Sequence, residues 1–209
     1  MTDHQRDSDA PTQEAYENTG RASQSLLIQR RYKELDDELL SLNPTGLADD
    51  HQWRVSAAVD LLGSVDHEFR ENLLYRGASL ILPNLLDFVW RRRAGILNDW
   101  LSQSRSRVAP SVCLAQLNFR HAWIARGNGY ARSVTTLGWE KFHDRISMAS
   151  ELLDSTEHCA ESFLPWFPLK LCVSKVDGSD RSVWYQTFER GVQANPTFWS
   201  TYTDRKSVV

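Results

Sequence analysis

Apolar residues recur at helical spacing along most of this chain, and that periodicity constrains the fold more than any other feature. One stripe has the spacing i, i+3, i+4 and i+7 of a single helix face: Val55, Ala58, Val59 and Leu62. A second stripe runs through residues 139–153. No window of four or more residues alternates apolar and polar types with β-branched enrichment, so a sheet is not expected. The pattern predicts an all-α protein.

Helix-breaking residues divide the chain into consecutive helical segments. The expected breaks are Asn43-Pro44, Pro83, Gly127-Asn128-Gly129 and Asn195-Pro196. Leucines of residues 26–42 predict an early helical hairpin. We therefore expect tandem helical hairpins, as a tetratricopeptide-like α-solenoid or an irregular helical bundle. Residues 1–22 lack apolar periodicity and predict a disordered acidic tail, and residues 23–209 a single helical-repeat-like domain.

The location expected from the sequence is the cytoplasm. The first twenty residues lack the basic and apolar regions of a signal peptide. The most apolar run, residues 80–90, is about half the roughly 20 residues that a membrane-spanning helix needs. A membrane partner is therefore not expected.

Charge is distributed unevenly along the chain. Residues 91–132 contain eight arginines and a single acidic residue, Asp99, which gives this block a net charge of +7. The whole chain carries −3, so the remainder carries −10. Two interpretations are open. In the first, some of the arginines pair with acidic residues of the fold and the others face solvent. In the second, the arginines form a surface that recognises an acidic partner.

One stretch resembles a known family. It reads Ala122-Trp123, Arg126-Gly127, Gly129-Tyr130-Ala131, then Val134-Thr135, Gly138-Trp139 and Phe142. It resembles the signature AWxxRGxGYA followed by VTxxGWxxF of an uncharacterised bacterial domain family with tetratricopeptide-like helices. The likeness covers about residues 96–202. It implies a further helix after Tyr202, so this copy is expected to be shortened. The family has no assigned activity, and the likeness therefore implies only a fold.

No residues form a recognisable active site, so we expect no enzyme, no cofactor and no bound metal. One alternative is a metal-dependent phosphohydrolase of the HD type, in which His121, His143 and Asp144, with Asp177 or Asp180, would hold a divalent ion. Another is nucleic-acid binding through the basic block from Arg91 to Arg132, which the acidic isoelectric point of about 6.1 disfavours.

The preferred hypothesis is a non-enzymatic protein-binding module, either an adaptor or an immunity protein that neutralises a bacterial toxin. The expected partner is another protein with an acidic surface, such as a toxin or a secretion-system component. Tryptophan, tyrosine and arginine are the residue types that anchor binding surfaces. The candidate contact residues are Trp90, Arg91, Arg92, Arg93, Arg126, Trp184 and Tyr185. No oligomeric state is predicted.

Overall fold

The computed structural model describes residues 13–42, 53–63, 82–127, 129–198 and 201–202. Within these ranges every regular element is a helix, which confirms the all-α prediction. The helices are α1 (Gln13–Ile28), α2 (Tyr32–Leu42), α3 (Trp53–Leu62), α5 (Leu82–Gln103), α6 (Val108–Arg126), α7 (Thr136–Asp154), α8 (Trp166–Ser174) and α9 (Arg181–Ala194), with short 3-10 helices η2 (Ala131–Ser133) and η3 (Glu157–Ser162).

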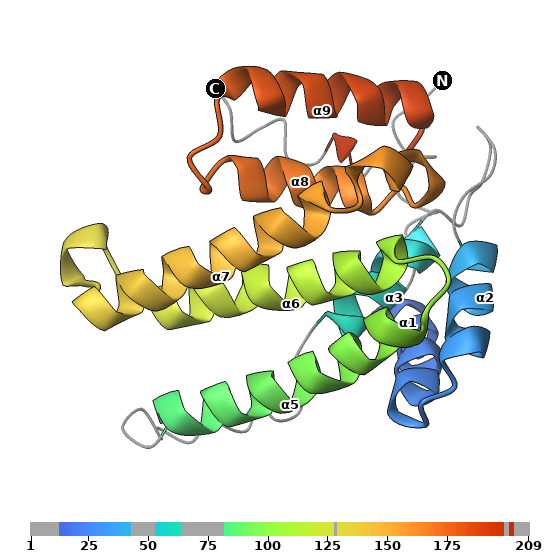
Figure 1. The fold of residues 1–209 in the computed structure, drawn as a ribbon, viewed down its shortest axis with the longest axis horizontal. Coiled ribbons are helices and arrows are strands. Elements are labelled where there is room, and N and C mark those ends of the chain that lie inside the picture. Colours follow the sequence, from blue (N-terminus) through green and yellow to red (C-terminus); the bar gives the residue numbers. More distant parts are fainter. Residues whose placement is uncertain (1–12, 43–52, 64–81, 128, 199–200, 203–209) are drawn as a thin grey trace.

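Consecutive hairpins pack around a shared core. Helices α6 and α7 lie side by side, and their connection projects from the bundle at the end opposite α1, α2 and α3 (Figure 1). Helix α5 runs along the other side of α6, and α8 and α9 stack beyond α7. The stripe expected on one face of α3 is buried at all its positions. These contacts confirm the helical-hairpin arrangement, while the expected break at Asn43-Pro44 lies outside the described residues.

Helix α1 corrects the predicted boundary of the disordered tail. It begins at Gln13, so residues 13–22 are helical rather than disordered; residues 1–12 lie outside the described ranges. The contact between α1 and α3 is made through Gly20, where an added Cβ would lie 2.8 Å from Leu61 Cβ and 2.9 Å from the carbonyl oxygen of Ala57. Because a glycine makes this contact, residues 13–22 lack the apolar stripe from which the helix could have been predicted.

Buried polar contacts fix the helices to one another. The Trp100 indole of α5 donates to the Asp36 carboxylate of α2 at 2.8 Å. The buried Lys170 of α8 donates to the Asp154 carboxylate of α7 at 2.6 Å. In the part of the chain that is described, no helix is long and apolar enough to cross a membrane.

Candidate functional site

The connection between α6 and α7 is held by its own backbone and side-chain bonds. Gly127 ends α6 with φ +75°, a conformation that favours glycine, and its N–H donates to the Trp123 carbonyl at 2.9 Å. Thr135 caps α7, because its hydroxyl accepts from the Gly138 N–H at 3.1 Å. Ser133 donates its hydroxyl to the Tyr130 carbonyl at 2.8 Å. The predicted helix-terminating turn is confirmed.

Five side chains next to this turn form a connected group, which we call the tip cluster: Trp123, Arg126, Trp139, Phe142 and His143. The Arg126 guanidinium carbon lies 5.4 Å from the ring centroids of both tryptophans. Phe142 meets both indoles edge to face, at centroid distances of 5.2 Å from Trp123 and 5.7 Å from Trp139. His143 stacks on Trp139 at 5.7 Å. Buried Phe142 therefore supports a partly exposed layer of indole, guanidinium and imidazole groups.

Large apolar side chains at this end of the hairpin face solvent. The exposed fraction is 40% for Trp123, 81% for Tyr130 and 59% for Leu137. Tyr130 does not pack back on the bundle. Its ring contacts the Arg132 guanidinium, 5.8 Å from the ring centroid, instead of the core. Tryptophan, tyrosine and arginine are the residue types enriched at binding hot spots.

No protein-family model, curated protein or solved structure matches this chain. The family likeness of residues 96–202 therefore stays a prediction.

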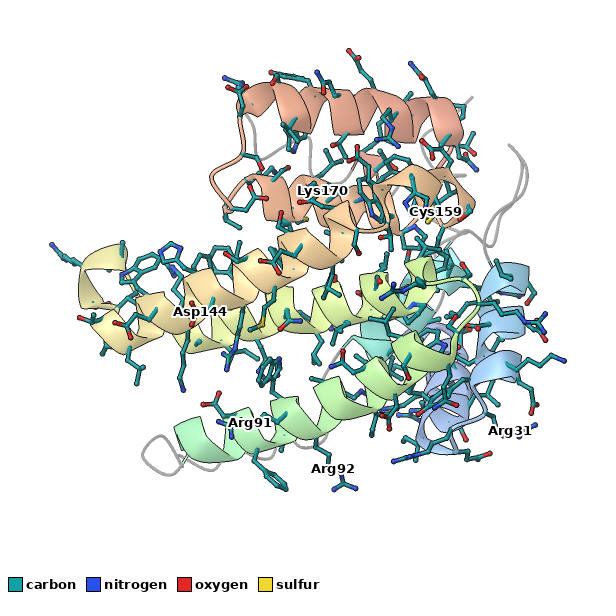
Figure 2. The ribbon with its side chains drawn as sticks, viewed as in Figure 1. Arg31, Arg91, Arg92, Asp144, Cys159 and Lys170 are labelled. Atoms are coloured by element: carbon teal, nitrogen blue, oxygen red, sulfur yellow. The ribbon has the colours of Figure 1, made fainter. Side chains whose placement is uncertain are left out.

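The candidate contacts on α5 separate into two environments. Arg91 and Arg92 are exposed, and Figure 2 shows Arg92 directed away from the other helices. Arg93 is buried and donates to the carbonyls of Leu62 at 3.2 Å and Leu61 at 3.1 Å. It closes the C-terminal end of α3 and is not exposed to a partner, contrary to the prediction.

Trp90 belongs to a polar cluster between α5 and the α6–α7 hairpin. Its half-buried ring lies 5.0 Å from the Arg145 guanidinium and 6.3 Å from the His121 ring. Arg145 is buried and donates to the Asp87 carboxylate at 2.5 Å and to the His121 carbonyl at 2.9 Å. Lys141 donates to the second Asp87 oxygen at 2.5 Å. Trp90 is thus a packing residue instead of the exposed anchor that we expected.

Burial and the charges of Lys141 and Arg145 shift the pKa values of Asp87 and His121 in this cluster. Burial alone would raise the pKa of Asp87, but the hydrogen bonds and charges of Lys141 and Arg145 together outweigh it and hold this pKa below its usual value. Burial, followed by repulsion from Arg145, lowers the pKa of His121 to about 4. His121 is therefore neutral near pH 7, and neither of its ring nitrogens has a hydrogen-bond partner among the described residues.

The two candidate contact residues on α9 also lie in different environments. Trp184 is 6% exposed and stacks on Phe188 with ring centroids 5.5 Å apart, so the exposed anchor predicted there is buried. Tyr185 is exposed as predicted, and its ring contacts the Arg181 guanidinium at 5.6 Å. Successive side chains of an α-helix point in different directions around its axis, so these adjacent residues lie on different faces.

The structure does not bring together the residues that the phosphohydrolase alternative would use to hold a metal ion. His121 is buried, whereas His143 and Asp144 are exposed on α7, from which Asp144 is seen to project in Figure 2. Asp180 caps α9, and Asp177 accepts from the Ser150 hydroxyl at 2.8 Å. Among the residues that the structure describes, no group of three or more His, Cys, Asp or Glu side chains is placed to hold a metal ion.

The basic block does not form one surface. Arg120 pairs with Asp60 at 2.7 Å, and Arg93 bonds to α3, while exposed Arg105 and Arg107 precede α6 and exposed Arg132 follows it. The two ends of α6 lie on opposite sides of the molecule (Figure 1). The block is therefore partly paired and partly solvated, as the first of the two interpretations held.

Sequence reasoning missed the tip cluster as a unit. It named Arg126 as a contact residue, but it placed Trp139 in the apolar stripe of residues 139–153 and named Trp123 only within the family signature. A usable signal was present, because Trp123 and Arg126 are three positions apart near the end of one helix and must share a face. The pairing of Arg145 with Asp87 joins residues 58 positions apart, and no local pattern indicates it.

Proposed function

We propose that this chain is a non-enzymatic protein-binding module that contacts its partner through the tip cluster and the adjoining side chains of Tyr130 and Leu137. The observation that carries the proposal is the exposure of Trp123, Tyr130 and Leu137 around Arg126, on a turn held by its own hydrogen bonds. Large rigid side chains lose little conformational entropy on binding and exclude water from the contact.

The capped helix ends and the hydrogen bonds of the connection support the proposal, because a surface held in one conformation has a lower free-energy cost of association. Both helix ends at the connection are capped, and Arg126 donates to the carbonyls of Gly127 at 3.1 Å and Gly129 at 3.4 Å. A surface already in its bound conformation loses less entropy on association than a flexible loop. An adaptor and a cytoplasmic immunity protein that covers a toxin are the two versions of this function that we propose.

Site-specific photo-crosslinking in the native host tests the proposal. A photo-reactive phenylalanine analogue at Tyr130 or Leu137 should give a covalent adduct with the same protein at both positions. Matched controls at the exposed residues Leu40 of α2 and Phe88 of α5 should not give that adduct.

Three crosslinking results would contradict the proposal. They are the absence of an adduct at Tyr130 and Leu137, equal adducts at Leu40, and adducts at Phe88 alone. The last result would place the contact on α5, beside Arg91 and Arg92, where the sequence predicted it.

A further inference from the structure

We propose that the Arg126 guanidinium is a binding site for a carboxylate of the partner protein, carried by an aspartate or glutamate side chain next to a large apolar residue. This inference rests on the proposed function and specifies the chemistry of the partner segment that reaches the tip cluster.

The guanidinium is held in place with part of its donor capacity unused. Its Nη1 donates to the carbonyls of Gly127 and Gly129, and the faces of Trp123 and Trp139 lie against it. A guanidinium has five N–H donors. The nitrogens Nε and Nη2 bond to no described residue, and neither is buried without a partner, so their donors reach solvent.

The charge around Arg126 is not neutralised within the described part of the chain. No acidic side chain forms an ion pair with Arg126 or with Arg132, which is exposed on the same connection. The acidic residues nearest in sequence on α7, Glu140 and Asp144, are exposed and pair with neither arginine. An incoming carboxylate would therefore meet no internal competitor.

The geometry of the free donors favours a carboxylate. Nε and Nη2 form one edge of the planar guanidinium, and this edge accepts a carboxylate through two parallel hydrogen bonds. The indoles beside Arg126 reduce its access to water, which strengthens a charged hydrogen bond. Exposed Trp123 and Leu137 offer apolar surface to the neighbouring residue of such a segment. A nucleic-acid backbone would instead need a row of cations, and the exposed arginines of residues 91–132 are divided among α5 and the two ends of α6.

Peptide selection on the full-length chain tests the inference. A random twelve-residue display library is selected on the immobilised protein, and binders are counter-selected on the variants Trp123→Ala and Tyr130→Ala. Peptides that depend on the tip should contain aspartate or glutamate next to an aromatic or aliphatic residue. For a representative peptide, we expect replacement of its glutamate by glutamine to weaken binding roughly tenfold or more.

Variants of the protein give the matching measurement. Arg126→Lys keeps the charge but loses the planar two-donor edge, so the glutamate peptide should bind it roughly tenfold more weakly while the glutamine peptide changes little. Arg132→Gln is the control, because it removes one charge from the same connection and should weaken binding by less than about threefold. Circular dichroism of each variant checks that the helices are intact.

Each negative result of these binding experiments would have a different consequence. Tip-dependent peptides without acidic residues, or with equal affinity after the glutamate-to-glutamine change, would overturn the carboxylate site and leave the protein-binding function standing. Tighter binding of a phosphoserine peptide or of a labelled single-stranded oligonucleotide than of the glutamate peptide would assign the arginine edge to phosphate. A selection with no tip-dependent peptide would count against both proposals.

Discussion

Arg93 and Arg92 are neighbours in the chain but have different physical roles. Arg93 is buried and supplies donors to two carbonyls at the end of α3, whereas Arg92 is exposed. A run of three arginines therefore contains a structural residue that composition alone does not distinguish from its neighbours.

Replacement of Arg93 should destabilise the protein more than replacement of Arg92. We expect Arg93→Met to lower the free energy of unfolding by about 2 kcal/mol, because the Leu61 and Leu62 carbonyls lose their donor. Arg92→Met is the matched control and should change this free energy by less than about 0.5 kcal/mol. Urea denaturation measures both, and equal losses would contradict the assigned role of Arg93.

His121 should make the protein sensitive to mild acid. Its pKa of about 4 in the folded chain lies below the ordinary value of 6.5, so the unfolded chain binds the proton more readily. Stability is therefore highest above about pH 6.5 and falls as the pH decreases toward 4. Since one pKa unit corresponds to about 1.4 kcal/mol, the loss from this group approaches about 3 kcal/mol.

A leucine at position 121 should remove this dependence. Urea denaturation of His121→Leu at pH 7 and pH 5 should show a smaller loss on acidification than the wild-type protein shows. The control His158→Gln changes an exposed side chain and should follow the wild-type values. An unchanged pH dependence in His121→Leu would show that other groups cause the acid sensitivity.

At the scale of helices, two glycines differ in how closely a neighbouring helix packs against them. Both lie inside helices, but Gly20 of α1 touches α3 and Gly95 of α5 has nothing within 4 Å of an added Cβ. The Ala57 carbonyl beside Gly20 belongs to the backbone and cannot move aside readily. Helix propensity favours alanine at both positions, so packing alone decides the difference.

The two alanine substitutions should therefore change stability in opposite directions. Gly20→Ala should lower the melting temperature, with a loss of about 1–3 kcal/mol from overpacking between α1 and α3. Gly95→Ala should raise it, with a gain of about 0.5–1 kcal/mol from the better helix former. Thermal denaturation followed by circular dichroism measures both, and a stabilised Gly20→Ala protein would refute the close contact.

Local patterns predicted the helices but not all of their partners. The stripe of α3 and the glycine stop after Arg126 follow from residues close in sequence, and both are confirmed. The start of α1 was missed because its contact uses Gly20 instead of a large apolar residue. Exposure was mispredicted at Trp90 and Trp184, since it depends on which helices meet in space, and periodicity within one helix does not determine that.

At the scale of the whole molecule, one core joins the two ends of the described chain. A continuous group of buried apolar residues includes Leu27 of α1, Trp100 of α5, Leu153 of α7 and Phe198 after α9. Hairpins in a linear solenoid contact only their neighbours. Here α6 contacts α3, α5, α7 and α8, which is closer to an irregular bundle.

A shared core predicts a single unfolding transition. Tryptophan fluorescence and far-ultraviolet circular dichroism should give coincident urea curves, because Trp100, in the first half of the chain, and Trp166, in the second, report on the same buried group. Separate midpoints would show that α8 and α9 unfold independently of α1, α2 and α3.

The arrangement of the tip cluster also bears on how such a surface can evolve. The ring and guanidinium contacts of its members join residues of α6 and α7, including the contact of Trp123 with Phe119 at 6.3 Å. Changes that adapt Tyr130 or Leu137 to a new partner would leave the shared core intact, and core changes selected for stability would leave recognition intact. Phe142 is subject to both pressures, because it is buried and also supports both indoles. Related chains should therefore vary widely at the exposed positions while retaining an aromatic ring at this one.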